Sequence, residues 1–396
     1  MPNQPPIVPM SSPDLTDLER QAVMDVLNTP DLSMGKRIEA FEASMSAFSG
    51  CRHAVGVSSG TAGLHLCVRA AGIGAGDLVI TTPFSFVASA NVLLFEGAAP
   101  VFVDVDPRTG NLLPDLVEEA ARDLSSGSAI TRRRWLPRRG VDETGKLKAI
   151  LAVDVFGQPA DYDPLRRTAD RYGLKLIEDS CEALGAEYKG RKAGALADYG
   201  VYAFYPNKQI TTGEGGVIVT DNQAAAQMMR ALRNQGRAPG DTWLQHTYLG
   251  YNYRLDEMSA ALGAAQMTRL PELLEKRQQV ADWYAERLAE IPGVQPPQLA
   301  DTTSRVSWFV FVIHLRPGID RARLAARLGD YGIPVRPYFL PIHLQPYMVE
   351  RFGFQPGDFP VTEDLGERGL ALPFSGKMSQ EQVDLVCKTL RDCLLE

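Results

Sequence analysis

Short apolar runs alternate with amphipathic stretches along most of this chain, from residue 55 onward. The strand-like runs lie at residues 79–81, 101–103, 149–153, 174–177, 199–204 and 215–220. The stretches between them space their apolar residues as one face of a helix does. Strands separated by helices predict a mostly parallel sheet covered by helices, and therefore an α/β fold.

The two ends of the chain depart from this alternation. Residues 1–35 are expected to form an N-terminal arm and a helix, which we expect to begin near Ser12, a suitable N-cap ahead of Pro13. The next segment, 36–49, repeats apolar residues at helical spacing.

A break in the helical pattern predicts the domain organisation. Two consecutive helices are expected over 255–291, and a proline- and glycine-rich stretch, 292–297, follows them. We therefore predict a large domain over residues 36–291. Residues 292–396 then form a small α+β domain, with a strand at 307–315, a helix at 321–328, a strand near Val335 and a last helix from about Ser379.

Composition limits the possible partners. The chain has 396 residues, of which 45% are hydrophobic and 22% charged, with a formal net charge of -7. An acidic balance disfavours nucleic acid or a membrane surface as the main partner. No apolar run approaches the roughly 18–20 residues of a membrane span. The first residues lack the features of a signal peptide, so a cytoplasmic location is expected.

Cysteine and histidine usage points away from disulfides and metals. Five cysteines at wide spacings form no disulfide framework, and no pair is separated by two residues. Five histidines are scattered along the chain without a zinc-binding pattern. No metal site is therefore expected.

A lysine and an acid each follow a predicted buried strand. Lys208 comes after the run 199–204, and Asp179 ends the run that begins at Leu174. Such residues are often ordinary polar groups of solvated loops. Pyridoxal phosphate chemistry needs this pair, because a lysine amine forms a Schiff base with the aldehyde. A carboxylate keeps the pyridine nitrogen protonated, so that the ring can accept electrons.

A third feature supplies a possible phosphate site. Residues 55–66 are typical of a short strand, a turn of small residues and a helix, with Ser59, Gly60 and Thr61 at the helix start. Free N–H groups and the positive end of the helix dipole bind phosphate at such a place. The alternative is an ordinary Ser/Thr helix cap.

Together these features resemble one family closely. The chain is similar to sugar aminotransferases of the DegT/DnrJ/EryC1/StrS group. The sequence around Asp179 and Lys208 is most like that of perosamine synthases. The resemblance covers nearly the whole chain and is carried by residues 59–61, 83–88, 155–158, 178–185, 205–216, 233–236, 250–255 and 372–373. It implies the aspartate aminotransferase fold, which is fold type I of the PLP-dependent transferases, with a mostly parallel seven-stranded sheet flanked by helices.

The resemblance also implies roles for the site residues. Lys208 would carry pyridoxal 5'-phosphate (PLP), and Asp179 would pair with its pyridine nitrogen. Ser59, Gly60 and Thr61 would bind the cofactor phosphate.

Further cofactor contacts follow from the same resemblance. Phe86 would lie against the cofactor ring. Glu182 stands where many relatives have Gln or His near a cofactor oxygen, and Asp154 stands where relatives often have His. Asn252 would reach the cofactor phosphate from the partner subunit, which makes the expected active unit a homodimer with shared sites. A helix cap or loop amide is the alternative for Asn252.

The implied reaction moves the amino group of glutamate to a ketone. The expected acceptor is a nucleotide-linked keto-deoxysugar, aminated at C4 of a 4-keto-6-deoxyhexose. Relatives that aminate a cyclitol or another ketone remain an alternative, as do a regulatory protein and PLP-dependent sugar dehydratases. Those dehydratases have His in place of the lysine, which Lys208 disfavours.

An arginine-rich segment, 131–139, has two interpretations. Five arginines surround Trp135 and Pro137. A solvated excursion before the strand at 149–153 is the preferred interpretation. The alternative is a clamp for the phosphates of a nucleotide-linked substrate, because the guanidinium fork suits phosphate.

Overall fold

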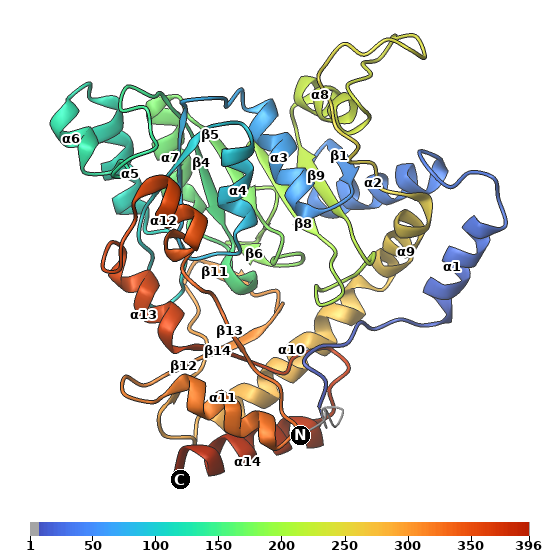
Figure 1. The fold of residues 1–396 in the computed structure, drawn as a ribbon. Coiled ribbons are helices and arrows are strands. Elements are labelled where there is room, and N and C mark those ends of the chain that lie inside the picture. The colour runs from blue at the N-terminus through green and yellow to red at the C-terminus, as the bar shows by residue number, and fades with distance from the viewer. Residues whose placement is uncertain (1–7, 396) are drawn as a thin grey trace.

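A computed structural model describes residues 8–395, and a seven-stranded sheet forms its centre (Figure 1). In sheet order the strands are β1 (His53–Val57), β9 (Gly216–Thr220), β8 (Tyr199–Ala203), β5 (Lys175–Asp179), β4 (Leu147–Val153), β2 (Leu78–Thr81) and β3 (Ala99–Phe102). Only β9 runs antiparallel to its neighbours, β1 and β8; the remaining pairs are parallel. The mostly parallel seven-stranded sheet is thus confirmed.

Helices cover both faces of this sheet, as alternate strand residues show. In β4, Leu151 and Val153 join one hydrophobic cluster, whereas Ile150 and Ala152 join another on the opposite face. The first cluster packs under α3 (Gly60–Ala70), α4 (Ala88–Phe95) and α8 (Gln223–Arg233). The opposite face is covered by α5 (Pro114–Ser125), α7 (Tyr162–Tyr172), α2 (Lys36–Ser49) and α9 (Glu257–Thr268).

The C-terminal part builds a second, antiparallel sheet. Its strands, in order, are β10 (Val294–Gln295), β12 (Phe311–Leu315), β14 (Gly369–Leu372) and β13 (Arg336–Pro337). A separate cluster packs it against α11 (Arg321–Asp330), α14 (Gln380–Leu395) and the end of α10 (Leu270–Leu288), the long helix that runs between the two sheets in Figure 1. The division into domains at residues 35 and 291 stays a prediction.

The remaining elements are short. A three-stranded sheet contains β11 (Thr303–Arg305), β6 (Glu187–Tyr188) and β7 (Arg191–Lys192). The helices α12 (Pro346–Phe352) and α13 (Pro360–Arg368) and the 3-10 turns η1 (Val155–Gly157) and η2 (Ile342–Leu344) complete this part. In residues 8–395 no helix is long and apolar enough to cross a bilayer.

The predicted helix start at Ser12 is wrong. Helix α1 (Asp17–Leu27) begins after Thr16, which forms a capping box with Glu19. Two hydrogen bonds join this pair: the Thr16 N–H and hydroxyl both donate to Glu19 Oε2, at 2.7 and 2.5 Å. The capping box satisfies the N–H of Thr16 and so favours a helix start at this residue. Residues 1–7 of the predicted arm lie outside the described residues.

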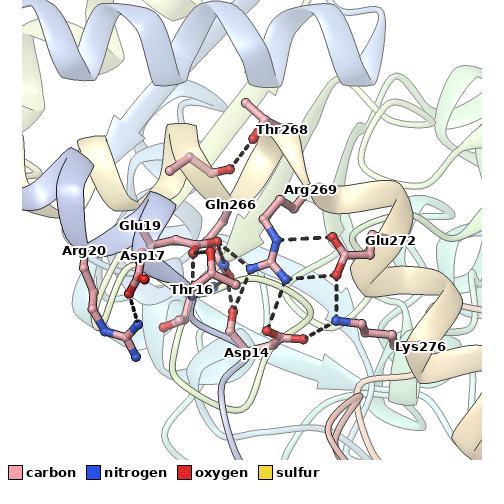
Figure 2. A network of polar contacts seen from close by, with 12 residues as sticks. Asp14, Thr16, Asp17, Glu19, Arg20, Gln266, Thr268, Arg269, Glu272 and Lys276 are labelled. Carbon is pink, nitrogen blue, oxygen red and sulfur yellow. Dashed lines mark hydrogen bonds and ion pairs between the residues drawn. The ribbon is translucent and has the colours of Figure 1, made fainter.

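Ion pairs fasten the arm to the junction of α9 and α10 (Figure 2). Arg269 donates to Glu19 Oε1 at 2.7 Å and to Asp14 Oδ1 at 3.1 Å. Lys276 pairs with the second oxygen of Asp14 at 2.8 Å. Gln266 donates to Glu19 Oε1 as well, at 2.7 Å. This group, Asp14, Glu19, Gln266, Arg269 and Lys276, is called the arm network below.

The arginine-rich segment forms α6 (Ala129–Arg133) and a loop, and its charges have partners. Arg134 pairs with Glu119, and Arg138 with Asp358. Neither arginine lines the cavity that contains Lys208. These pairs support the interpretation of a solvated excursion.

Candidate active site

All but one of the predicted site residues meet in one cavity at the carboxyl ends of β4, β5 and β8. Its volume is about 490 Å³. The C-terminal edge of parallel strands is where α/β proteins commonly bind ligands. The predicted residues that line it are Ser59, Gly60, Thr61, Phe86, Asp179, Glu182 and Lys208. Asn252 is not among them.

Lys208 lies in the loop between β8 and β9, and its side chain is largely buried. The ammonium Nζ is 3.6 Å from Oε1 of Glu182. It also lies 3.7 Å from the centre of the Phe309 ring, a cation–π contact. The amine is therefore held between a carboxylate and an aromatic face, inside the cavity.

Asp179 ends β5, the strand next to β8, and its carboxylate is buried. The Ser89 hydroxyl donates to Oδ2 at 2.7 Å, and the Cys181 N–H donates to Oδ1 at 3.2 Å. Within residues 8–395 no Lys, Arg or His nitrogen lies within 4 Å of this carboxylate. A buried carboxylate normally has a cationic partner. The Asp179 carboxylate therefore has no cationic partner among the described residues.

The start of α3 forms another wall of the cavity. The Ser59 side chain accepts a hydrogen bond from the N–H of Ala62 at 3.0 Å, so Ser59 caps the helix. A Cβ at Gly60 would lie 2.7 Å from Cβ of Ala203 and 2.8 Å from Sγ of Cys181. Only glycine lets the helix start approach β8 this closely. First-turn N–H groups lack partners within a helix, so those of α3 are available to an anion in the cavity.

Phe86 and Glu182 complete the lining. Phe86 is 62% exposed although it is a large apolar residue, and it borders the cavity. The N–H of Phe156 donates to Oε2 of Glu182 at 3.0 Å, which fixes the carboxylate. Burial raises the pKa of Glu182, and the Lys208 ammonium opposes this rise. Glu182 therefore favours its neutral form more than an exposed glutamate does.

The other two positions lie elsewhere. Asn252 is exposed, and its backbone pairs with that of Asn234. Asp154 is fully buried and does not line the cavity; it accepts hydrogen bonds from the Tyr162 and Ser180 hydroxyls. Neither side chain is placed in the cavity of its own subunit.

Several residues that line the cavity or support its lining were not identified from the sequence. Ser89 lies one helical turn after Ser85 and donates to Asp179. A serine on the inner face of α4 was the available signal. Phe309, Tyr338 and Phe339 come from the C-terminal part of the chain. No local pattern connects these aromatic residues with Lys208.

Nearly the whole chain matches one family model. The DegT/DnrJ/EryC1/StrS aminotransferase family model covers residues 13–391. The chain belongs to this family. This is a family of aminotransferases that depend on PLP, so the chain is a PLP-dependent aminotransferase.

Individual relatives agree with this assignment. A GDP-perosamine synthase of Caulobacter vibrioides is 35% identical, and the match covers 98% of this chain and 99% of that protein. A putative pyridoxal phosphate-dependent aminotransferase of Bacillus subtilis, EpsN, is 33% identical over 96% of this chain and 94% of its own length. The aminotransferase PseC of Helicobacter pylori, which acts in pseudoaminic acid biosynthesis, superposes with a TM-score of 0.87. That match has 28% identity and covers 98% of both chains.

The residues of the cavity fit the cofactor of this family. The α3 N-terminus offers donors to a phosphate, Lys208 offers a buried amine, and Asp179 offers a carboxylate without a cation. A pyridinium N–H is a cation of the kind that Asp179 lacks. When bound, PLP supplies an electron sink for the transfer of an amino group.

Proposed function

We propose that this aminotransferase takes the amino group of glutamate and places it on C4 of a nucleotide-linked 4-keto-6-deoxyhexose. The observation that carries the proposal is the cavity in which Lys208, Asp179 and the start of α3 converge. The similarity to a GDP-perosamine synthase along nearly the full length of both chains supports the choice of substrate class.

Lys208 is the proposed catalytic base and acid. Its amine lies in the cavity, where it can remove a proton from a reacting carbon and return it. Glu182 accepts from the Phe156 N–H and holds the Lys208 amine at 3.6 Å, so it orients that group. The Phe309 ring on the other side excludes water from the amine.

Asp179 is the proposed partner of the pyridine nitrogen. Ser89 and the Cys181 N–H hold both of its oxygens, so the carboxylate cannot rotate away. A fixed negative charge at this position keeps a proton on the ring. The exposed face of Phe86 is available to stack on the ring from above.

A substrate screen tests this proposal. The purified enzyme would be incubated with glutamate and, separately, with GDP- and dTDP-linked 4-keto-6-deoxyhexoses, a 3-keto sugar and a cyclitol ketone. We expect a product with the mass of an amino sugar only from 4-keto nucleotide sugars. Amination of the cyclitol alone would contradict the proposed substrate class while leaving the aminotransferase assignment intact.

We also propose that the active site is shared across a homodimer. Asn252 is exposed, whereas its neighbours Tyr251 and Tyr253 are stacked at 4.9 Å and turned inward. The Tyr251 hydroxyl donates to Glu96 at 3.0 Å, and Tyr253 lies 3.0 Å from His65 Nδ1. Both anchors direct Asn252 away from its own subunit.

An exposed apolar segment follows α8 and supports the same proposal. Trp243, Leu244 and Leu249 are at least three-quarters exposed, in the loop that projects from the body in Figure 1. Contiguous exposed apolar side chains mark interaction surfaces. This loop leads directly to Asn252 along the chain.

Subunit mixing tests the shared site. Lys208→Ala and Asn252→Ala homodimers should both be impaired, the second through weaker cofactor retention. A heterodimer places both changes in one site and leaves the other site intact. Mixing under subunit exchange should restore up to about one quarter of normal activity if half the dimers are mixed. Proven exchange without recovery would show that Asn252 does not act across subunits.

A further inference from the structure

Arg277 is a buried cation on the apolar side of a long helix. In α10 the buried positions include Leu273, Leu274, Val280 and Tyr284, and Arg277 occupies the same stripe. It is 4% exposed. An arginine at such a position is rare unless a specific partner holds it.

The partners of Arg277 are backbone carbonyl groups. One guanidinium nitrogen donates to the carbonyls of Lys208 and Asn207, at 2.5 and 3.2 Å. The other terminal nitrogen donates to the carbonyls of Trp308 and Phe309, at 3.1 and 3.3 Å. A single side chain thus joins the loop that carries Lys208 to the segment that carries Phe309.

These two segments hold the reactive amine between them. The Lys208 ammonium lies over the Phe309 ring at 3.7 Å, so any shift between their backbones displaces the amine. Arg277 does not line the cavity that contains Lys208, and it contacts the Lys208 loop from the opposite side. It therefore cannot reach a substrate there.

No carboxylate within residues 8–395 lies within 4 Å of the Arg277 guanidinium nitrogens. Burial lowers the pKa of Arg277 to about 10, and only the more distant charge of Asp14 opposes this. Removing such a charge from water is costly. The four carbonyl contacts offset part of this cost, and an apolar residue of similar size would make none of them.

We propose that Arg277 is a positioning residue that fixes the Lys208 amine against Phe309 for proton transfer. The inference rests on the proposed role of Lys208. The planar fork of arginine donates to two pairs of carbonyls at once, which the single ammonium of lysine cannot do. A displacement of about 1 Å at a reacting group can cost roughly 100-fold in rate.

Two variants test the proposal in two measurements. Arg277→Met keeps the volume and removes all four donors, and Arg277→Lys keeps the charge. The first measurement is the absorbance change of the loaded enzyme on rapid mixing with glutamate, over a range of glutamate concentrations. We expect the limiting rate to fall roughly 100-fold in Arg277→Met and roughly 10-fold in Arg277→Lys, with half-saturation changed less than about threefold.

The second measurement uses the cofactor-free protein. Hydrogen–deuterium exchange should become faster in the peptides that contain Lys208 and Phe309, and in both together. Arg269→Met is the matched control, because Arg269 is on the same helix but binds the arm network. It should leave these two peptides and the limiting rate within about twofold of the parent.

The outcomes separate the two proposals. No absorbance change with glutamate in the unsubstituted enzyme would contradict the proposed function. A normal change there, combined with limiting rates in both Arg277 variants within about twofold of the parent, would overturn the inference alone. If Arg277→Met does not fold, Arg277→Lys decides: an unchanged limiting rate overturns the proposal, and a fall in that rate supports it.

Discussion

The cavity and the arm network use the same kinds of charged residue in opposite ways. In the arm network, Glu19 and Asp14 share Arg269, and Lys276 completes the set (Figure 2). In the cavity, Asp179 is equally buried but has no cation among the described residues. Paired charges hold an element in place, whereas a fixed charge without a counterpart is available to a ligand.

The pKa directions express the same difference. Burial alone would raise the pKa of Glu19, but Thr16 and Arg269 outweigh it and hold the pKa at about 2. Burial raises the pKa of Glu182, and Lys208 at 3.6 Å compensates only in part. The pKa is therefore lowered for Glu19 and raised for Glu182, because only Glu19 has enough close hydrogen-bond and cationic partners to outweigh burial.

The largest effect is expected from Asp179→Asn. The amide keeps the shape and the contact with Ser89 but removes the charge that would hold a proton on the ring. Turnover should fall roughly 100- to 1,000-fold, as measured by product formation at saturating glutamate and acceptor. Asp198→Asn is the control, because Asp198 precedes β8 at the other end of the sheet and pairs with Arg166 at 3.2 Å. Equal losses of turnover in the two variants would contradict a special role for an acid that has no cationic partner.

A smaller effect, dependent on pH, is expected from Glu182→Gln. Glutamine imitates the protonated carboxyl, and the raised pKa of Glu182 keeps that form populated to higher pH than usual. The parent and the variant should therefore have similar rates on the acid side, where Glu182 is protonated. They should diverge by roughly tenfold as pH rises and Glu182 ionises, because the parent then gains a charged acceptor for the Lys208 amine. Parallel pH–rate profiles would show that ionisation of Glu182 does not affect the reaction.

The smallest effect on catalysis is expected from Glu19→Gln, which should act on stability instead. The variant removes the most deeply buried of the carboxylates that pair with Arg269 and should lose about 3 kcal/mol of unfolding free energy in urea at neutral pH. The lowered pKa of Glu19 stabilises the fold above its ordinary value of 4.5, and this contribution is lost as pH falls towards about 2. The difference between parent and variant should therefore shrink on acidification.

An exposed pair on the same helix provides the control for Glu19. Asp17 and Arg20 pair at 2.8 Å in Figure 2, but their side chains are 100% and 65% exposed. Asp17→Asn should leave the unfolding free energy almost unchanged, because solvent screens an exposed ion pair. A comparable loss of unfolding free energy in both variants would show that the buried ion pairs of the arm network stabilise the fold no more than an exposed pair does.

The sequence predicted those parts of the molecule whose signals are local. The central strands follow apolar runs, so β2, β4, β8 and β9 were found close to their observed bounds. Lys208 and Asp179 were paired correctly in space, because β8 and β5 are neighbours and both residues follow the same edge of the sheet. Hydrophobic periodicity is sufficient for the strands, whereas the pairing of Lys208 with Asp179 also needed the resemblance to the family.

Features that depend on distant contacts were not predicted. Helix α1 begins five residues after Ser12, at Asp17, because Thr16 and Glu19 form the capping box. Arg277 looked like one of many charges on an amphipathic helix, and only its position on the buried stripe was a signal. Phe309 is 101 residues beyond Lys208, and no local pattern brings such residues together.

The central claim is that the buried lysine beside the unpaired acid carries the cofactor. Borohydride reduction of the PLP-loaded enzyme, followed by peptide mapping, tests it most directly. We predict a pyridoxyl group on Lys208, in the peptide that contains residues 205–216. A label on Lys276 of the arm network, or on any other lysine, would contradict the account.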